Sequence, residues 1–323
     1  MIWVTWRQNR AEGFVALGVL LLSSLFLLVT GLQMAHDFQQ SGLSDCLAHH
    51  TQSAICATLA KAFMNQYSPF LPFASALVFL PILLGVIVGA PLVAREFEQR
   101  THQLVWLQSI TRMRWLSVKV VVVLGTSLLA ALALMVLLIW WYSPFSQLIG
   151  SFNQVTFDFA GPVLIASTAM ALALGIFAGT LTRRTVFAIF LTIVLIVVIR
   201  IGVEFNLRPN YEPPIIVTWP LVQGDNPATV GTQPPPIILK TQDWNLGQGF
   251  MDAQGNKTGV FRCTGPQTQT LAQCIQTNGY RNYLSYQPAN RFWTFQWIET
   301  SIYLAFTLVA VGTTFLLMKR RPT

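Results

Sequence analysis

A charged segment between two long apolar runs holds the residues of this chain that could make specific contacts with a partner. Between positions 89 and 119 it carries Arg95, Glu96, Glu98, Arg100, Arg112, Arg114 and Lys119. Alternating charges on good helix formers extend a helix into water. Thr101 can then end this helix and begin another, and Ser109 or Thr111 can cap the next one, because a hydroxyl oxygen accepts from unpaired N–H groups. The pattern predicts a bent helical rod that a partner could grip; the alternative is a solvated loop.

No set of catalytic residues accompanies this segment. The chain has no Gly-x-x-x-x-Gly-Lys-Ser/Thr phosphate loop, no His-Glu-x-x-His and no Gly-x-Ser-x-Gly. His102 is a lone histidine next to Thr101, and a solvated or interfacial role explains it best. We therefore expect no catalytic residue, metal site or cofactor in this chain, and any energy source must come from a partner.

The rest of the sequence indicates an integral membrane protein. Of its 323 residues, 53% are hydrophobic and 10% are charged, whereas soluble domains carry about 25% charged residues. A hydrocarbon core about 30 Å thick needs roughly 20 apolar residues in a helix. Six stretches reach this length: Phe14 to Ala35, Phe70 to Ala94, Val118 to Tyr142, Phe157 to Leu181, Thr185 to Val203 and Trp297 to Met318.

The distribution of charge predicts the orientation of these spans. If both termini are cytoplasmic, twelve Lys or Arg residues and three acidic residues fall on the inner side of the membrane. Seven Lys or Arg residues and nine acidic residues then fall on the outer side. Short loops rich in Lys and Arg stay in the cytoplasm. The basic residues follow the inner face of a cell membrane, and no nucleic-acid partner is needed to explain them.

All four cysteines fall on the outer side of this topology. The expected disulfides pair Cys46 with Cys56 and Cys263 with Cys274, since each pair closes a short loop and disulfides persist in oxidising compartments. Free buried thiols or a metal site are the alternatives.

The sequence divides into three regions, and the middle one is predicted to be a domain outside the membrane. Residues 1–203 hold five spans, the charged loop at 95–117 and an N-terminal helix that lies in the membrane interface or simply flanks the first span. Residues 204–292 have eight prolines between Arg208 and Pro236, which excludes long helices and predicts short strands and irregular loops. Residues 293–323 hold the sixth span and a basic tail. The expected fold is an all-α membrane protein with this small β or irregular domain.

Small and charged residues within the spans predict local packing. Two Gly-x-x-x-Gly pairs, Gly85 with Gly89 and Gly175 with Gly179, allow close helix approach within the bundle or at a subunit interface. We expect only Arg200 to lie clearly inside a span, where it can snorkel or pair with Glu204 one turn later. The apparent lack of intramembrane acids argues against an ion-driven pump.

The topology and the charged segment together resemble a known family. The extension Ala94-Arg95-Glu96-x-Glu98-x-x-Thr101, which closes with Thr111-Arg112-x-x-Trp115-x-x-x-Lys119, is similar to the permease subunit of type-2 ABC exporters, particularly the stand-alone permeases of actinobacteria and related Gram-positive bacteria. The resemblance covers the membrane region and not the outer domain. It implies that this loop carries a coupling helix that docks on an ATPase. The residues implied in this coupling are Arg95, Glu96, Glu98, Arg100 and Thr101 at the elbow, and Gln103, Leu104, Trp106 and Gln108 on the contact face.

The function that this resemblance implies is outward transport of an amphipathic or hydrophobic substrate such as a drug, lipid or peptide. Two ATPase subunits would bind ATP and Mg, and a second permease subunit, identical or sister, would complete the complex. The alternative is a non-transporting membrane sensor or assembly protein whose outer domain binds a ligand or partner.

Overall fold

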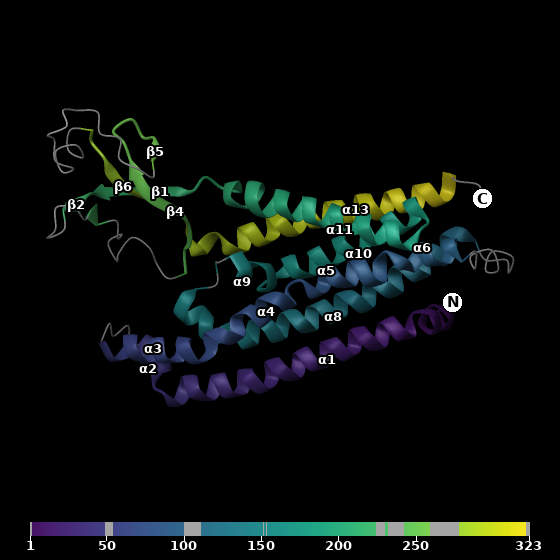
Figure 1. Cartoon of the computed structure of the whole chain (residues 1–323), viewed down its shortest axis with the longest axis horizontal. Coiled ribbons are helices and arrows are strands. Elements are labelled where there is room, and N and C mark those ends of the chain that lie inside the picture. Colours follow the sequence, from purple (N-terminus) through teal and green to yellow (C-terminus); the bar gives the residue numbers. More distant parts are fainter. Residues whose placement is uncertain are drawn as a thin grey trace.

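Long helices form an elongated bundle with a small β-sheet at one end in the computed structural model (Figure 1). The structure describes residues 2–48, 54–99, 111–150, 152, 154–223, 230–231, 242–258 and 278–320. Six helical stretches are long and apolar enough to cross a membrane: Gly13–Gln40, Ala54–Glu98, Arg112–Ile149, Pro162–Thr182, Thr185–Asn210 and Ala289–Arg320. The expected helical membrane fold is therefore confirmed, and each observed stretch contains most of the predicted span or extends beyond it.

The elements follow one another in a simple order. The helices are α1 (Ile2–Gln40), α2 (Leu43–Ala48), α3 (Ala54–Tyr67), α4 (Leu71–Leu77), α5 (Leu80–Leu84), α6 (Pro91–Glu98), α8 (Arg112–Ile149), α9 (Gln154–Phe159), α10 (Pro162–Thr182), α11 (Thr185–Ile201) and α13 (Phe292–Arg320). Short 3-10 or π segments are η1 (Ser68–Phe70), η2 (Gly85–Gly89), η3 (Gly202–Leu207), η4 (Arg208–Asn210) and η5 (Ala289–Arg291). The strands are β1 (Ile215–Pro220), β2 (Val222–Gln223), β3 (Val230–Gly231), β4 (Trp244–Met251), β5 (Lys257–Thr258) and β6 (Arg281–Gln287).

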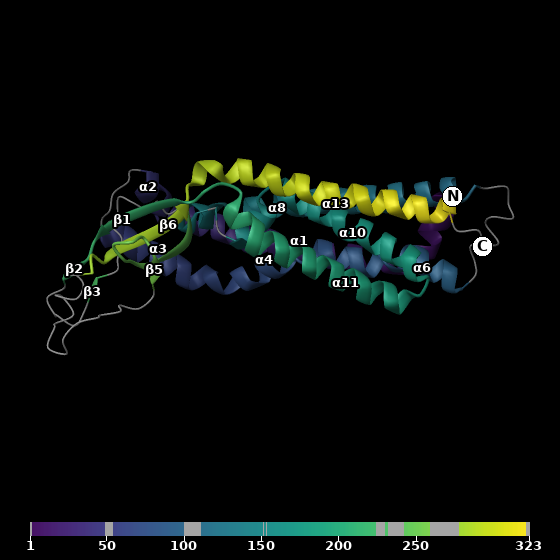
Figure 2. The same ribbon diagram turned by 90° about the horizontal axis from the view of Figure 1, so that it is seen from above.

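Both chain ends lie at the same end of the bundle. In two perpendicular views the N-terminal end of α1 and the C-terminal end of α13 lie beside the end of α6, opposite the sheet (Figures 1 and 2). An even number of spans requires this arrangement. The end of α6 and the start of α8 therefore lie at the same end of the bundle as the two termini.

The first helix is continuous where a separate interfacial helix was expected. Residues 2–12 belong to α1, which runs without a break from Ile2 to Gln40. No proline interrupts this part of the sequence, and a helix continues until something breaks it. The N-terminal segment is thus continuous with the first span, and its place in the membrane interface stays a prediction.

Helix α10 forms the centre of the bundle. In its apolar window 89% is buried, against 18% for the span in α1. The expected glycine pairs, Gly85 with Gly89 and Gly175 with Gly179, face each other here. A methyl group on Gly85 would lie 2.5 Å from the carbonyl carbon of Ala171, and one on Gly179 would lie 2.5 Å from the carbonyl oxygen of Ala90. Backbone packs directly on backbone at this seam, so both pairs act within the bundle.

The region after the fifth span contains the small β-domain. Its larger sheet is antiparallel with strand order β1-β6-β4-β5, and β2 pairs with β3 separately. Strand β6 is central and buries Leu284 and Gln287 completely. The predicted mixture of short strands and turns matches the described parts of this region, residues 215–223, 230–231, 242–258 and 278–287.

A disulfide fastens the helical hairpin at the same end as the sheet. Cys46 in α2 is bonded to Cys56 in α3, which confirms this predicted pair. Cys263 and Cys274 lie outside the described residues, so their pairing stays a prediction.

Candidate functional site at the two ends of the bundle

The charged end of α6 is anchored to the bundle on both sides. The Glu96 carboxylate forms an ion pair with the Lys119 ammonium of α8, and only 7% of Glu96 and 4% of Lys119 is exposed. The Lys119 ammonium also lies 4.8 Å from the ring centre of Trp115. A buried pair of this kind is costly to break, because the remaining charge has no solvent to stabilise it. Helices α6 and α8 are thus joined at the point where the loop between them begins and ends.

Glu98 makes a second anchor, to α11. One of its carboxylate oxygens, Oε2, accepts hydrogen bonds from the Thr185 backbone N–H at 3.0 Å and from the Thr185 hydroxyl at 2.7 Å. An acid at a helix N-terminus satisfies unpaired N–H groups and interacts favourably with the helix dipole. Beside it, the Arg183 guanidinium lies 5.2 Å from the ring centre of Phe97. The end of α6 is therefore fixed to both α8 and α11.

The sequence correctly predicted the cap of α8, and three of the predicted coupling residues, Arg95, Glu96 and Glu98, lie in the described end of α6. Thr111 caps α8, since its hydroxyl oxygen accepts from the Arg114 N–H at 3.3 Å. Arg95 is exposed at the end of α6. The predicted elbow and contact residues outside the described part are Arg100, Thr101, Gln103, Leu104, Trp106 and Gln108. Their roles stay predictions.

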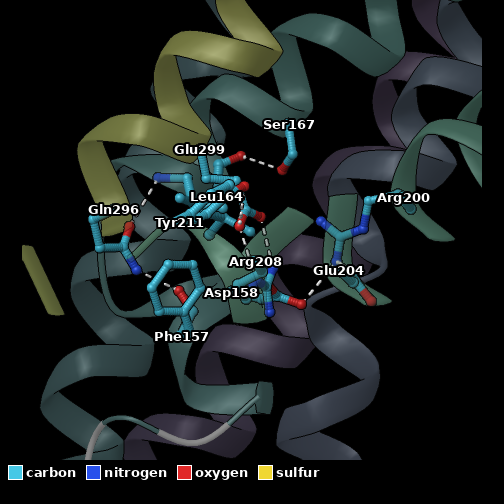
Figure 3. A network of polar contacts seen from close by, with 11 residues as sticks. Phe157, Asp158, Leu164, Ser167, Arg200, Glu204, Arg208, Tyr211, Gln296 and Glu299 are labelled. Atoms are coloured by element: carbon cyan, nitrogen blue, oxygen red, sulfur yellow. Dashed lines mark hydrogen bonds and ion pairs between the residues drawn. The ribbon is translucent and has the colours of Figure 1, made fainter. Parts of the chain in front are cut away.

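At the opposite end, five charged side chains form a buried network (Figure 3). Its members come from α9, α11, η3, η4 and α13: Asp158, Arg200, Glu204, Arg208 and Glu299. Arg208 is 1% exposed and Glu299 is fully buried. Ion pairs at this depth are stable only when the charges are closely matched by partners.

Arg208 is the central member of this network. Its Nε and Nη2 donate to the two oxygens of Glu299 at 2.8 and 2.6 Å, and Nη2 also donates to Asp158 at 2.6 Å. Arg200 Nη2 lies 2.8 Å from the other Asp158 oxygen and 2.6 Å from Glu204 Oε1. Bidentate arginine pairs combine strength with fixed geometry. The network thereby holds α9, α11 and α13 together at the sheet end of the bundle.

Neutral groups complete this arrangement. The Tyr211 hydroxyl donates to Glu299 at 3.3 Å; burial, reinforced by the charge of Glu299, raises the pKa of Tyr211, so the hydroxyl keeps its proton. Gln296 donates to the Phe157 carbonyl at 2.6 Å and accepts from the Val163 N–H at 3.3 Å. Gln296 thus caps the start of α10 from α13.

The network corrects the expectation that Arg200 alone lies clearly inside a span. The pairing of Arg200 with Glu204 is present, but Asp158 and Glu299 also fall within the predicted spans and are buried with them. Lys119 is likewise buried inside the third span. The sequence could have indicated these buried ion pairs, because ionisable residues within apolar stretches are rare and usually paired. Because these acids are present, the sequence-based argument against an ion-driven pump does not hold.

Comparison with known proteins gives the class of this chain. A family model described as ABC-2 membrane transporter related matches residues 17–208. This match covers more than half of the sequence, so the chain belongs to that family. It is a transporter permease: the non-catalytic, membrane-spanning component, located as a multi-pass protein in the plasma membrane.

The match includes the anchored end of α6 and all of the network except Glu299. The β-domain and α13 lie beyond it. No curated protein and no solved structure matches the chain.

Proposed function

We propose that the chain is the permease subunit of an ATP-driven exporter, and that an ATPase docks on the segment between α6 and α8. The observation that carries this proposal is the double anchoring of the α6 end. Glu96 ties it to Lys119 of α8, and Glu98 ties it to Thr185 of α11. Membership of the ABC-2 family supports the transporter part of the proposal.

The anchors suggest how a force on this segment reaches the membrane. A displacement of the α6 end would move α8 and α11 with it, because charges and hydrogen bonds connect all three. The glycine seam joins η2 and α6 to α10 through direct backbone packing. Packed helices have discrete alternative arrangements, so a rigid movement at one end changes the packing of the whole bundle.

The remaining parts of the proposal follow from charge and composition. The positive-inside pattern favours a cytoplasmic location for the α6–α8 segment, where two ATPase subunits would bind ATP and Mg. A second permease subunit, identical or sister, would complete the complex. Many apolar side chains on the outer surface of α1 and α11 are exposed, which fits lipid, a partner subunit or an amphipathic substrate such as a drug, lipid or peptide. Export is the proposed direction.

The family match favours a transporter over a membrane sensor or assembly protein. A sensor of this kind would need no ATPase. Binding of an ATPase to the chain therefore distinguishes a transporter from a sensor. Tagged protein extracted gently from native membranes should retain a protein with a phosphate-loop motif, and candidate substrates should stimulate its ATP hydrolysis. Extraction without any ATPase, under conditions that keep other ABC complexes intact, would contradict the proposal.

The choice of variants follows from the geometry. Reversing Glu96 to lysine places a second ammonium beside buried Lys119, so it tests folding more than coupling. We therefore propose the double variant Gln103→Ala with Trp106→Ala in the predicted contact face. Trp293→Ala is the matched control, since Trp293 is 58% exposed at the opposite end of the bundle. Only the first variant should lose the ATPase.

A further inference from the structure

A groove between α1 and α3 lies at the sheet end of the bundle and takes no part in the network or in the α6 anchors. It has a volume of about 590 Å³ and is lined by Leu32, Gln33, His36, Asp37, Gln66 and Tyr67. The first four come from the last turns of α1, and the other two come from the end of α3. Among these lining residues there is one carboxylate and no lysine or arginine.

Asp37 lines the groove, and hydrogen bonds from α3 hold its carboxylate in place. Its Oδ2 accepts hydrogen bonds from the Tyr67 hydroxyl at 2.6 Å and from Gln66 Nε2 at 3.2 Å. The other oxygen, Oδ1, lies 3.6 Å from His36 Nδ1, and the Asp37 side chain is 45% exposed. Tyr67 and Gln66 thus orient the carboxylate while leaving it open to a ligand. A carboxylate fixed in this way favours a cation and repels an anion.

Apolar side chains continue from the groove along α1. Leu25, Leu28 and Leu32 follow one another at intervals of three and four residues, which places them on one face of the helix. They are 59%, 44% and 61% exposed. A hydrocarbon chain can lie along this face while a charged head occupies the groove, as amphiphiles do at a membrane interface.

We propose that this groove binds an amphiphile with a positively charged amine head and a hydrocarbon tail. The head pairs with Asp37, and the tail lies along α1. Two sources share this chemistry: the ethanolamine or choline head of a membrane lipid, and a soluble amphipathic amine. The proposal concerns binding to the permease chain itself, so it can succeed or fail independently of the ATPase partnership.

The test is a binding measurement on the full chain without an ATPase. The protein is placed in nanodiscs of phosphatidylglycerol, which contains no amine, and radiolabelled decyltrimethylammonium is titrated. We expect saturable binding that Asp37→Asn weakens at least tenfold. Asp45→Asn is the matched control, because Asp45 is an exposed acid in nearby α2 that does not line the groove; its affinity should stay within twofold of the wild type.

A second variant keeps the test valid if Asp37→Asn fails to fold. Gln33→Lys preserves the hydrogen bonds of Asp37 and places a competing ammonium in the groove, so it should also weaken binding at least tenfold. Equal affinity of the wild type and a folded Asp37 or Gln33 variant would overturn the proposal. So would equally tight binding of decyl sulfate.

The source of the amine is read from competition. Nanodiscs that include phosphatidylethanolamine or phosphatidylcholine should displace the probe if a lipid head occupies the site. Unchanged probe affinity in these nanodiscs would assign the site to a soluble amphiphile. Either result supports the amine site, provided that the dependence on Asp37 holds.

Discussion

Replacing Arg208 with methionine should destabilise the protein far more than removing an exposed arginine. Arg208 is 1% exposed and makes three short hydrogen bonds to two carboxylates. Methionine fills much of the same volume, but it removes both arginine hydrogen bonds of Glu299 and leaves Asp158 paired with Arg200. Removing one partner of a buried ion pair costs about 3–5 kcal/mol.

The matched control is Arg291→Met. Arg291 pairs with Glu212 at 2.6 Å, but its side chain is 23% exposed and that of Glu212 is 32% exposed. A pair that water reaches contributes about 0.2–1 kcal/mol. At about 2–4 °C per kcal/mol for larger domains, Arg208→Met should lower the apparent Tm by roughly 10 °C and the control by no more than a few degrees.

The assay is size-exclusion chromatography of heated, detergent-solubilised protein. Adding Glu299→Gln to Arg208→Met should recover part of the loss, because it removes one of the uncompensated charges. Equal Tm values for Arg208→Met and Arg291→Met would refute the argument that the network stabilises the sheet end of the bundle.

Three further predictions use other parts of the structure. Gly175→Ala should lower the apparent Tm by several degrees, because its methyl group would meet the Gly85 carbonyl oxygen and lie 2.8 Å from the Ala90 nitrogen, whereas Gly125→Ala meets nothing within 4 Å and should be tolerated. Cys46→Ser with Cys56→Ser should cost somewhat under ~3 kcal/mol, the chain-entropy value for a short closed loop, and a reducing agent should destabilise the wild type more than this variant. In the turn at Asp252, hydrogen bonding from the Asn256 N–H lowers the pKa of the carboxyl; its stabilisation is therefore complete above about pH 4 and is lost as the pH falls through the lower folded-state pKa. Hydrogen exchange at Asn256, corrected for intrinsic rates, should rise in acid in the wild type and depend less on pH in Asp252→Asn.

The sequence predicted the spans well, because apolar length and charge asymmetry are local properties. The helix from Arg112 to Ile149 contains the expected span from Val118 to Tyr142, and Thr111 caps it as one of two proposed residues. The cysteine pair was equally accessible, since Cys46 and Cys56 are only ten residues apart. Where an element depends on nearby residues, composition and spacing are sufficient.

The contacts between distant segments were not predictable in this way. Glu98 and Glu96 were identified as charged residues of a coupling elbow, yet their partners are 87 and 23 residues away. The network was missed because Asp158 and Glu299 each stand alone in an apolar stretch, and Arg208 follows a span whose end was placed at Val203. Only the packing of α9, α11 and α13 brings these three charges together.

The central claim is that the segment between α6 and α8 contacts an ATPase, and photo-crosslinking from within that segment tests it most directly. A photoreactive amino acid is placed at Gln103 in living cells, with the same amino acid at exposed Trp293 as the control. The account predicts a crosslink from position 103 to a protein with a phosphate-loop motif, and none to that protein from position 293. A correctly inserted protein that forms no such crosslink from position 103 or its neighbours, or forms it equally from position 293, would contradict the account.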